Sequence, residues 1–168
     1  VGYTQPQYSA SLMVNQKYNG WEDGYYSTVK GHRRLVSGDT GAQTVNSTNY
    51  GLRGWWRPAE TGTATPSVSV GYDTSKTDAS GNDSTNAYFV GLNWQDMINV
   101  DDRIGIAFGL PQKHEDDTID PFLFEIYYDY KVNDSITVTP AIFGGTSKNK
   151  DGLKTDMSGV LLNTQYNF

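Results

Sequence analysis

Histidine and acidic side chains are the first groups in this sequence that could carry out chemistry. The only histidines are His32 and His114, which lie in separate segments rich in serines or acids. A hydrolytic site needs a nucleophile, a base and a group that orients the base, all brought together. The chain contains no GxSxG, P-loop or HExxH motif that would place such groups at a catalytic spacing. We therefore predict that the protein is not an enzyme and has no catalytic residues.

Two acidic segments offer oxygen atoms to a metal ion. They are DASGND at 78–83 and HEDDTID at 114–120. Calcium and magnesium accept such oxygens, but neither segment has the spacing of a calcium-binding loop. The chain has no cysteine, which excludes thiolate sites, and two separate histidines make a poor iron site. We predict no metal site and no cofactor, and interpret both segments as hydrated loops.

Charged residues also recur within otherwise apolar segments, at every second position. In FEIYYDYKVNDSITVTPAIF, at 124–143, Ile126 belongs to an apolar set, whereas Glu125 and Asp129 belong to a polar set. Period-two alternation on both sides of an Asn-Asp pair predicts a tight antiparallel hairpin. Pro140 cannot donate a hydrogen bond to a strand ladder, so we predict a bulge or local bend there.

The same alternation runs along the whole chain and defines its elements. Helical periodicity is nearly absent. Each alternating segment puts an apolar or aromatic set on one face and polar or small side chains on the other. These segments are 8–18, 46–57, 66–75, 86–95, 102–110, 120–132, 135–145 and 156–168. The sequence therefore predicts an all-β, antiparallel protein with about eight visible strands.

Alternation alone also fits a soluble β-sandwich, and three further features favour a transmembrane barrel. Most of the segments are about 9–11 residues long, which suits a tilted strand that crosses the hydrocarbon layer. Long polar connections alternate with short ones such as DMINVD. The connection PAETGTAT, at 58–65, is an exception, because it is longer than the other short connections. Aromatic residues gather at the ends of the apolar sets, where they would form a lipid-facing girdle. These residues are Tyr8, Tyr50, Trp56, Tyr72, Tyr88, Trp94, Tyr130, Tyr166 and Phe168.

These features together predict one domain, 1–168, folded as an antiparallel transmembrane β-barrel of the outer-membrane porin type. Apolar faces would meet lipid, and charged faces would line the interior. Closure is required because unpaired backbone groups in hydrocarbon are costly. The 36% hydrophobic content is low for a domain with a large dry interior. The formal net charge of −6, without a basic stripe, argues against a nucleic-acid partner.

A porin would carry its selectivity in the charges that line the pore. We predict the pore-lining charges to be Lys17, Arg53, Arg57, Asp73, Arg103, Glu125, Asp129 and Lys131. The long connection 19–45 would form a constriction loop, with charge supplied by Lys30, His32, Arg33 and Arg34. The alternatives are that the inward charges pair with one another to fill the interior, and that the loop charges form a solvated face.

Two motifs carry a resemblance to a known family. NAYFVGLNWQDM (86–97) and FLFEIYYDYKVNDSITVTPAIF (122–143), with the closing LLNTQYNF, resemble the C-terminal barrel part of cyanobacterial outer-membrane porins that have an S-layer-homology domain. These proteins belong with the carbohydrate-selective or iron uptake porins. The resemblance covers 48–168, and Phe168 matches the terminal aromatic that the barrel-insertion machinery reads in this class.

The resemblance implies a water-filled channel for passive diffusion of inorganic ions and small hydrophilic solutes, including carbohydrates. It also implies a homotrimer in the outer membrane of a Gram-negative-type, cyanobacteria-like envelope, in contact with lipid and lipopolysaccharide. Family members have an S-layer-homology domain and more strands, so the chain would be the C-terminal portion of a larger barrel. The alternative is a complete, closed eight-stranded barrel, filled by side chains, that acts in surface recognition or envelope stability.

Overall fold

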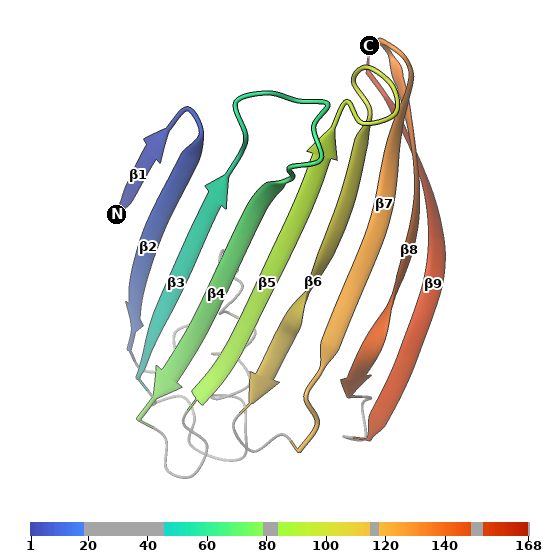
Figure 1. The fold of residues 1–168 in the computed structure, drawn as a ribbon. Coiled ribbons are helices and arrows are strands. Elements are labelled where there is room, and N and C mark those ends of the chain that lie inside the picture. Colours follow the sequence, from blue (N-terminus) through green and yellow to red (C-terminus); the bar gives the residue numbers. More distant parts are fainter. Residues whose placement is uncertain (19–45, 79–83, 115–117, 149–152, 168) are drawn as a thin grey trace.

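A computed structural model describes residues 1–18, 46–78, 84–114, 118–148 and 153–167. These residues form strands and no helix (Figure 1), so no apolar helix long enough to cross a membrane occurs among them. The strands are β1 (Gly2–Gln5), β2 (Tyr8–Lys17), β3 (Ser47–Trp56), β4 (Ser67–Thr77), β5 (Ser84–Gln95), β6 (Arg103–His114), β7 (Phe122–Asn133), β8 (Ile136–Lys148) and β9 (Lys154–Tyr166).

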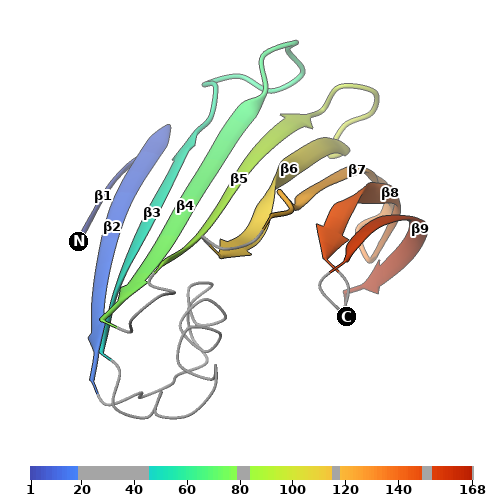
Figure 2. The ribbon, with the colours of Figure 1, turned by 90° about the horizontal axis from the view of Figure 1, so that it is seen from below.

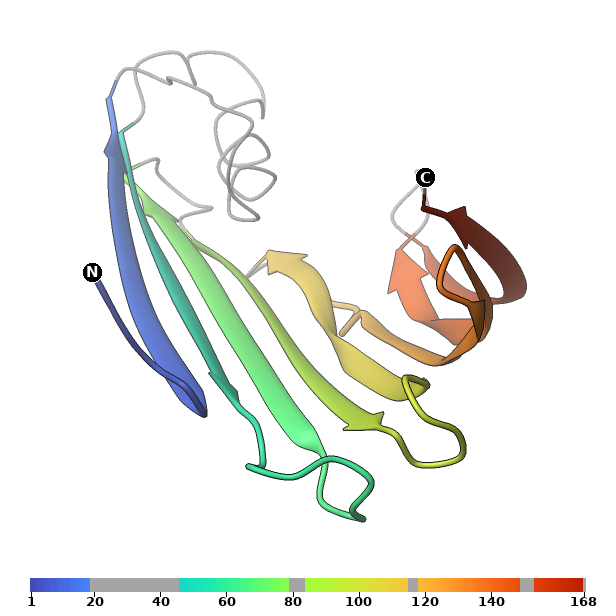
Figure 3. The ribbon, with the colours of Figure 1, turned by 90° about the horizontal axis from the view of Figure 1, so that it is seen from above.

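The strands form one antiparallel sheet in which each strand pairs with the next along the chain. The sheet curves into a trough, and its two edges stand apart (Figures 2 and 3). The all-β antiparallel fold predicted from sequence is confirmed. The sheet has nine strands instead of eight, and it is open, because β1 and β9 do not pair with each other within the described part of the chain. The short β1 was missed because four residues are too few for alternation to be recognised.

The eight predicted segments correspond to β2–β9, and most of the differences lie at one end of the sheet. Strands β4, β5, β6, β8 and β9 extend beyond the predicted segments at the end where connections 18–46, 78–83, 115–121 and 149–153 are attached. We call this the long-loop end. The added residues, such as Lys76, Ser84 and Lys154, are mostly polar, so they continue the backbone ladder without continuing the apolar alternation. The predicted hairpin forms, but its turn is Asp134–Ser135, one residue later than the predicted Asn133–Asp134 link.

The other end of the sheet, which we call the short-turn end, carries the connections Pro6–Gln7, 57–66, 96–102 and Asp134–Ser135 (Figure 1). The alternation of long and short connections therefore follows the prediction, with 57–66 as the exception already visible in the sequence.

Pro140 interrupts the ladder between β7 and β8 without shifting its register. The pairs Tyr127↔Ala141 and Tyr130↔Val138 share one register, and no pair is formed between them. The register shift of this hairpin lies near the turn, between Lys131 and Asn133. Of the two predicted possibilities at Pro140, the bulge was therefore wrong, and the local bend stays a prediction. Because proline lacks a backbone N–H, it removes a ladder bond while the flanking residues keep their alignment.

Residue numbers of one parity share one face of the sheet from β2 to β9. Cross-strand pairs join odd residues to odd and even to even, apart from bulges at the ends of β5–β6 and β7–β8. We call the two surfaces the odd face and the even face. Apolar side chains on the even face are exposed, including Ile142 (50%), Leu162 (68%) and Val160 (80%).

Burial in this sheet is the reverse of burial in a soluble domain. Ala141 is the only buried hydrophobic residue among those described. The buried polar residues are Lys17, Ser47, Asn49, Asp73, Ser75, Thr85 and Asp102. A β-sandwich buries the apolar face of each sheet between two layers. The described strands instead form a single layer whose apolar face stays uncovered.

The odd face is less polar than predicted towards the C-terminus. Leu123 and Tyr127 of β7, Phe143 of β8, and Met157 and Leu161 of β9 all lie on it. The prediction of a wet or small second face in every segment was therefore wrong for these strands. A run of apolar residues, such as FLF at 122–124, puts apolar side chains on both faces of the strand. The alternating pattern then reveals only one of the two apolar faces.

Large side chains on the odd face lie against glycines of the neighbouring strand. Tyr127 occupies the space that a side chain at Gly105 would fill, and Phe143 does the same at Gly159. An aromatic ring that covers a glycine in this way helps to fix strand register. It also lets a bulky residue lie close to the backbone of the neighbouring strand.

The turn between β5 and β6 is organised by a buried carboxylate. Asp102 is 1% exposed and accepts hydrogen bonds from the backbone amides of Met97 (3.0 Å), Ile98 (3.2 Å) and Asn99 (2.8 Å). The hydroxyl of Tyr128 donates a further bond of 2.9 Å. The turn is therefore tied both to itself and to β7.

Stability should fall in acid because of Asp102. Burial raises the pKa of Asp102, but the hydrogen bonds that its carboxylate accepts outweigh burial and hold the pKa below its usual value. The pKa of Asp102 is lower in the folded protein than in the unfolded chain, where it is about 3.9. The ionised carboxylate therefore stabilises the folded protein at pH values above the unfolded-state pKa, and this contribution is lost as the pH falls through the folded-state pKa. Asp102→Asn should therefore be less stable than wild type at pH 7, and the gap should close below about pH 4. Urea unfolding at a series of pH values measures the difference in the free energy of unfolding between the two proteins. A difference that stays constant down to pH 2 would contradict the stabilising role of the Asp102 carboxylate.

Candidate functional site on the odd face of the sheet

The predicted pore-lining charges lie on one face of the sheet. Lys17, Arg53, Asp73, Arg103, Glu125, Asp129 and Lys131 occupy odd positions of β2, β3, β4, β6 and β7, and Arg57 follows β3 directly. Alternation places them there because every second side chain of a strand points to the same side.

The central pair on this face is Arg53 and Asp73. Nη2 of Arg53 lies 2.8 Å from Oδ2 of Asp73, which is 6% exposed. The guanidinium group of Arg53 also lies 5.8 Å from the centroid of the Phe89 ring. This arrangement follows the alternative considered from sequence, in which inward charges pair with one another. The pair leaves the guanidinium partly open to the trough.

A second charged group lies near the short-turn end. Nζ of Lys131 lies 2.9 Å from Oδ2 of Asp101 and 3.2 Å from Oδ1 of Asp134. Asp129 accepts a 2.6 Å hydrogen bond from the hydroxyl of Thr139 and lies opposite Arg103 in the β6–β7 register. The charge of Lys131 is therefore balanced by two turn carboxylates.

The remaining predicted charges occupy opposite ends of the face. Lys17 is 1% exposed at the long-loop end of β2. Arg57 is exposed at the short-turn end, where its Nε donates to the carbonyl of Pro6 at 2.7 Å. Its guanidinium carbon lies 5.6 Å from the Trp55 ring centroid.

The girdle aromatics that the structure describes all lie on the even face and fall into two bands. Tyr8, Trp56, Trp94, Tyr130 and Tyr166 lie towards the short-turn end. Tyr50 and Tyr88 lie in the long-loop half of β3 and β5, and Tyr72, which pairs with Tyr88, lies at the centre of β4. On β5, the separation of Tyr88 and Trp94 corresponds to about 20 Å of strand. Phe122 and Phe124 of β7 extend the second band, a contribution that sequence reasoning missed.

Several predicted groups lie outside the described residues. The constriction-loop residues Lys30, His32, Arg33 and Arg34 belong to 19–45, and most of the two acidic segments falls in 79–83 and 115–117. Within the described part of the chain, no three His, Cys, Asp or Glu residues gather as a metal site.

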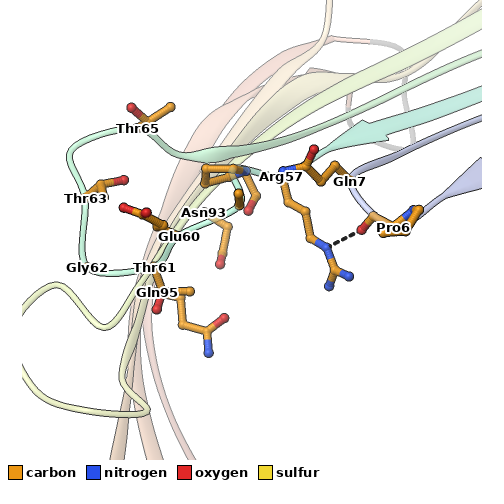
Figure 4. Close-up of a pocket in the computed structure, with 13 residues that line it drawn as sticks. Pro6, Gln7, Arg57, Glu60, Thr61, Gly62, Thr63, Thr65, Asn93 and Gln95 are labelled. Carbon is orange, nitrogen blue, oxygen red and sulfur yellow. Dashed lines mark hydrogen bonds between the residues drawn. The ribbon is translucent and has the colours of Figure 1, made fainter.

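A polar pocket of about 430 Å³ lies at the short-turn end of the sheet (Figure 4). It lies between the β1–β2 turn, the connection 57–66 and the ends of β4 and β5. Hydroxyl, amide and guanidinium groups line it, among them Gln7, Arg57, Thr61, Thr63, Thr65, Asn93 and Gln95. Such groups can hydrogen-bond a polar solute or water. The threonine-rich stretch TGTATP was the only sign of this pocket in the sequence, where it predicted a connection between strands.

Comparison with known proteins gives no relative: no family model matches the chain, and no curated protein or solved structure matches it.

Proposed function

We propose that this chain forms part of the wall of an outer-membrane β-barrel porin, a water-filled channel for passive diffusion of ions and small hydrophilic solutes. The observation that carries the proposal is the reversed burial of the sheet. Exposed apolar side chains cover the even face, while the buried residues among those described are polar or are glycine, alanine or proline, and include no large apolar side chain. This distribution suits a sheet with acyl chains on one side and water on the other.

A sheet in bulk water would be unstable with this surface. Each large apolar side chain left exposed forgoes about 1.5–3 kcal/mol of burial free energy, and contiguous exposed patches of this kind mark membrane or protein contacts. The two aromatic bands add support, because aromatic rings favour the two interfaces of a bilayer.

Strand direction supports the view that the barrel is larger than this sheet. Successive strands are antiparallel, so β1 and β9 run in the same direction. Joining these two edges directly would create a parallel pair. An all-antiparallel closed barrel therefore needs an odd number of additional strands between them. This agrees with the resemblance to S-layer-homology-domain porins, in which the chain would be one portion of the barrel, in a trimer embedded in lipid and lipopolysaccharide.

The first test is ion conduction. Protein folded from the full polypeptide should give stepwise conductance in planar bilayers. Arg53→Ala should shift the reversal potential in a KCl gradient towards cation selectivity, because it removes a positive charge from the odd face and leaves the carboxylate of Asp73.

Arg57→Ala is the matched control, since it removes the same charge from the short-turn end. It should change selectivity less than Arg53→Ala. Bilayers that stay silent with correctly folded protein would contradict the channel and favour the alternative, a filled barrel that acts in surface recognition.

A further inference from the structure

A second pocket, of about 330 Å³, lies on the odd face over β5–β9. Its walls are mostly apolar and include Phe89, Leu123, Phe143 and Met157. Ala107 and Gly109 of β6 form a floor of small residues. A pocket of this composition would hold an apolar group well.

The one charged side chain that lines this pocket is Glu125. In the register, Glu125 lies directly opposite Phe143 on one side and Ala107 on the other. It is half-buried and, unlike the other carboxylates on the odd face, makes no ion pair or hydrogen bond with any residue that the structure describes. A carboxylate beside apolar walls and without a counter-ion attracts a cation.

The rings beside this carboxylate lean away from it and leave the pocket open. Phe89 lies against Gly71 of β4, and Phe143 lies against Gly159 of β9. Both rings are therefore turned away from β6 and β7, and neither of them covers Ala107 of β6 or Glu125 of β7. The missing side chains at these glycines therefore help to create the space in front of Glu125.

We propose that this pocket binds a small organic ammonium ion, such as a quaternary amine. The Glu125 carboxylate would be the counter-ion, and the Phe143 ring and Leu123 would contact the alkyl groups. Aromatic rings favour such cations because their faces carry partial negative charge. A hydrated metal ion suits the site less well, because only one carboxylate is present and the other lining side chains, apart from Tyr88, are apolar.

The inference rests on the proposed function, because a solute reaches the odd face through a water-filled lumen. It adds a substrate class to that function. An organic ammonium ion that binds at Glu125 would pass through the channel at a different rate from an inorganic cation of the same charge.

Choline and its neutral isostere 3,3-dimethylbutan-1-ol provide the test. The protein is folded in non-ionic detergent and titrated with each compound by saturation-transfer NMR. Choline should bind, and Glu125→Gln should weaken it by about tenfold, the range expected for loss of a charged partner. The neutral isostere should bind weakly and equally to both proteins. Phe143→Leu should weaken choline by about threefold.

Matched variants make the outcome specific. Glu60→Gln removes a carboxylate at the short-turn end and should leave choline binding unchanged. Ala107→Val narrows the pocket and should weaken choline while Glu125 is retained; it also provides a second test if Glu125→Gln fails to fold. Absence of choline binding, or equal binding by wild type and Glu125→Gln, would overturn the inference. KCl conductance measured separately reports on the channel, so failure of one proposal is distinct from failure of the other.

Discussion

Ile142→Lys is expected to destabilise the protein by about 2–4 kcal/mol when it is folded in lipid vesicles. Ile142 is 50% exposed on the even face and pairs with Ile126 and Val160 in the middle of their strands. In the proposed membrane orientation this row lies near the bilayer centre, where a lysine is most costly. Urea unfolding in vesicles, followed by tryptophan fluorescence, measures the change.

Val132→Lys is the control for depth in the membrane. Val132 is also on the even face and is 48% exposed, but it lies at the short-turn end of β7. A lysine near the interface should cost about 0–1 kcal/mol. If the even face met water instead of lipid, both substitutions would fall within about 0.5 kcal/mol of wild type. Equal, small effects at the two positions would therefore contradict the membrane orientation.

Gly145→Ala should destabilise the sheet by about 3 kcal/mol, through both strain and overpacking. Gly145 has a φ of 144°, in a region that residues with a side chain rarely adopt. An added Cβ would lie 2.9 Å from Cα of Leu123 and would also meet the carbonyl of Phe122. Because these are backbone atoms, β7 and β8 would have to move apart. Thermal unfolding in detergent measures the loss.

Gly54→Ala is the matched control for this substitution. Its added Cβ would lie 3.5 Å from both the Ser9 carbonyl and the Val70 side chain, which is ordinary contact. Gly54 should therefore accept alanine with little change. A similar loss at Gly54 and Gly145 would show that the strands resist any added methyl group, and that the backbone at Gly145 is not special.

Much of the sheet could be predicted from the sequence because its even face carries an apolar side chain at nearly every second position of each strand. The alternation of Ile126 with Glu125 and Asp129 located β7, its face and its hairpin partner. Strand ends were less predictable where polar residues continue the ladder, as at Lys76 and Lys154. Backbone hydrogen bonds hold those residues in the sheet, and no periodic apolar signal accompanies them.

The sequence predicted which charged residues share one face of the sheet, but not which of them form ion pairs with one another. Alternation placed Arg53 and Asp73 on the same face, yet their 2.8 Å ion pair depends on the β3–β4 register, which the sequence does not specify. The apolar pocket around Glu125 was missed for a different reason. It requires Phe143 to lie over Gly159, a contact between strands that no local pattern encodes.

The interrupted ladder at Pro140 divides the β7–β8 hairpin into two separately bonded stretches. Between them, the backbone near Tyr128 and Asp129 lacks partners on β8. Both residues stay paired with β6. In deuterated solvent, an amide of this stretch that points to β8 should therefore lose its proton earlier than an amide at Ile126 or Lys131, although all four residues belong to one strand. The middle of β7 would then open more readily than the residues on either side of it.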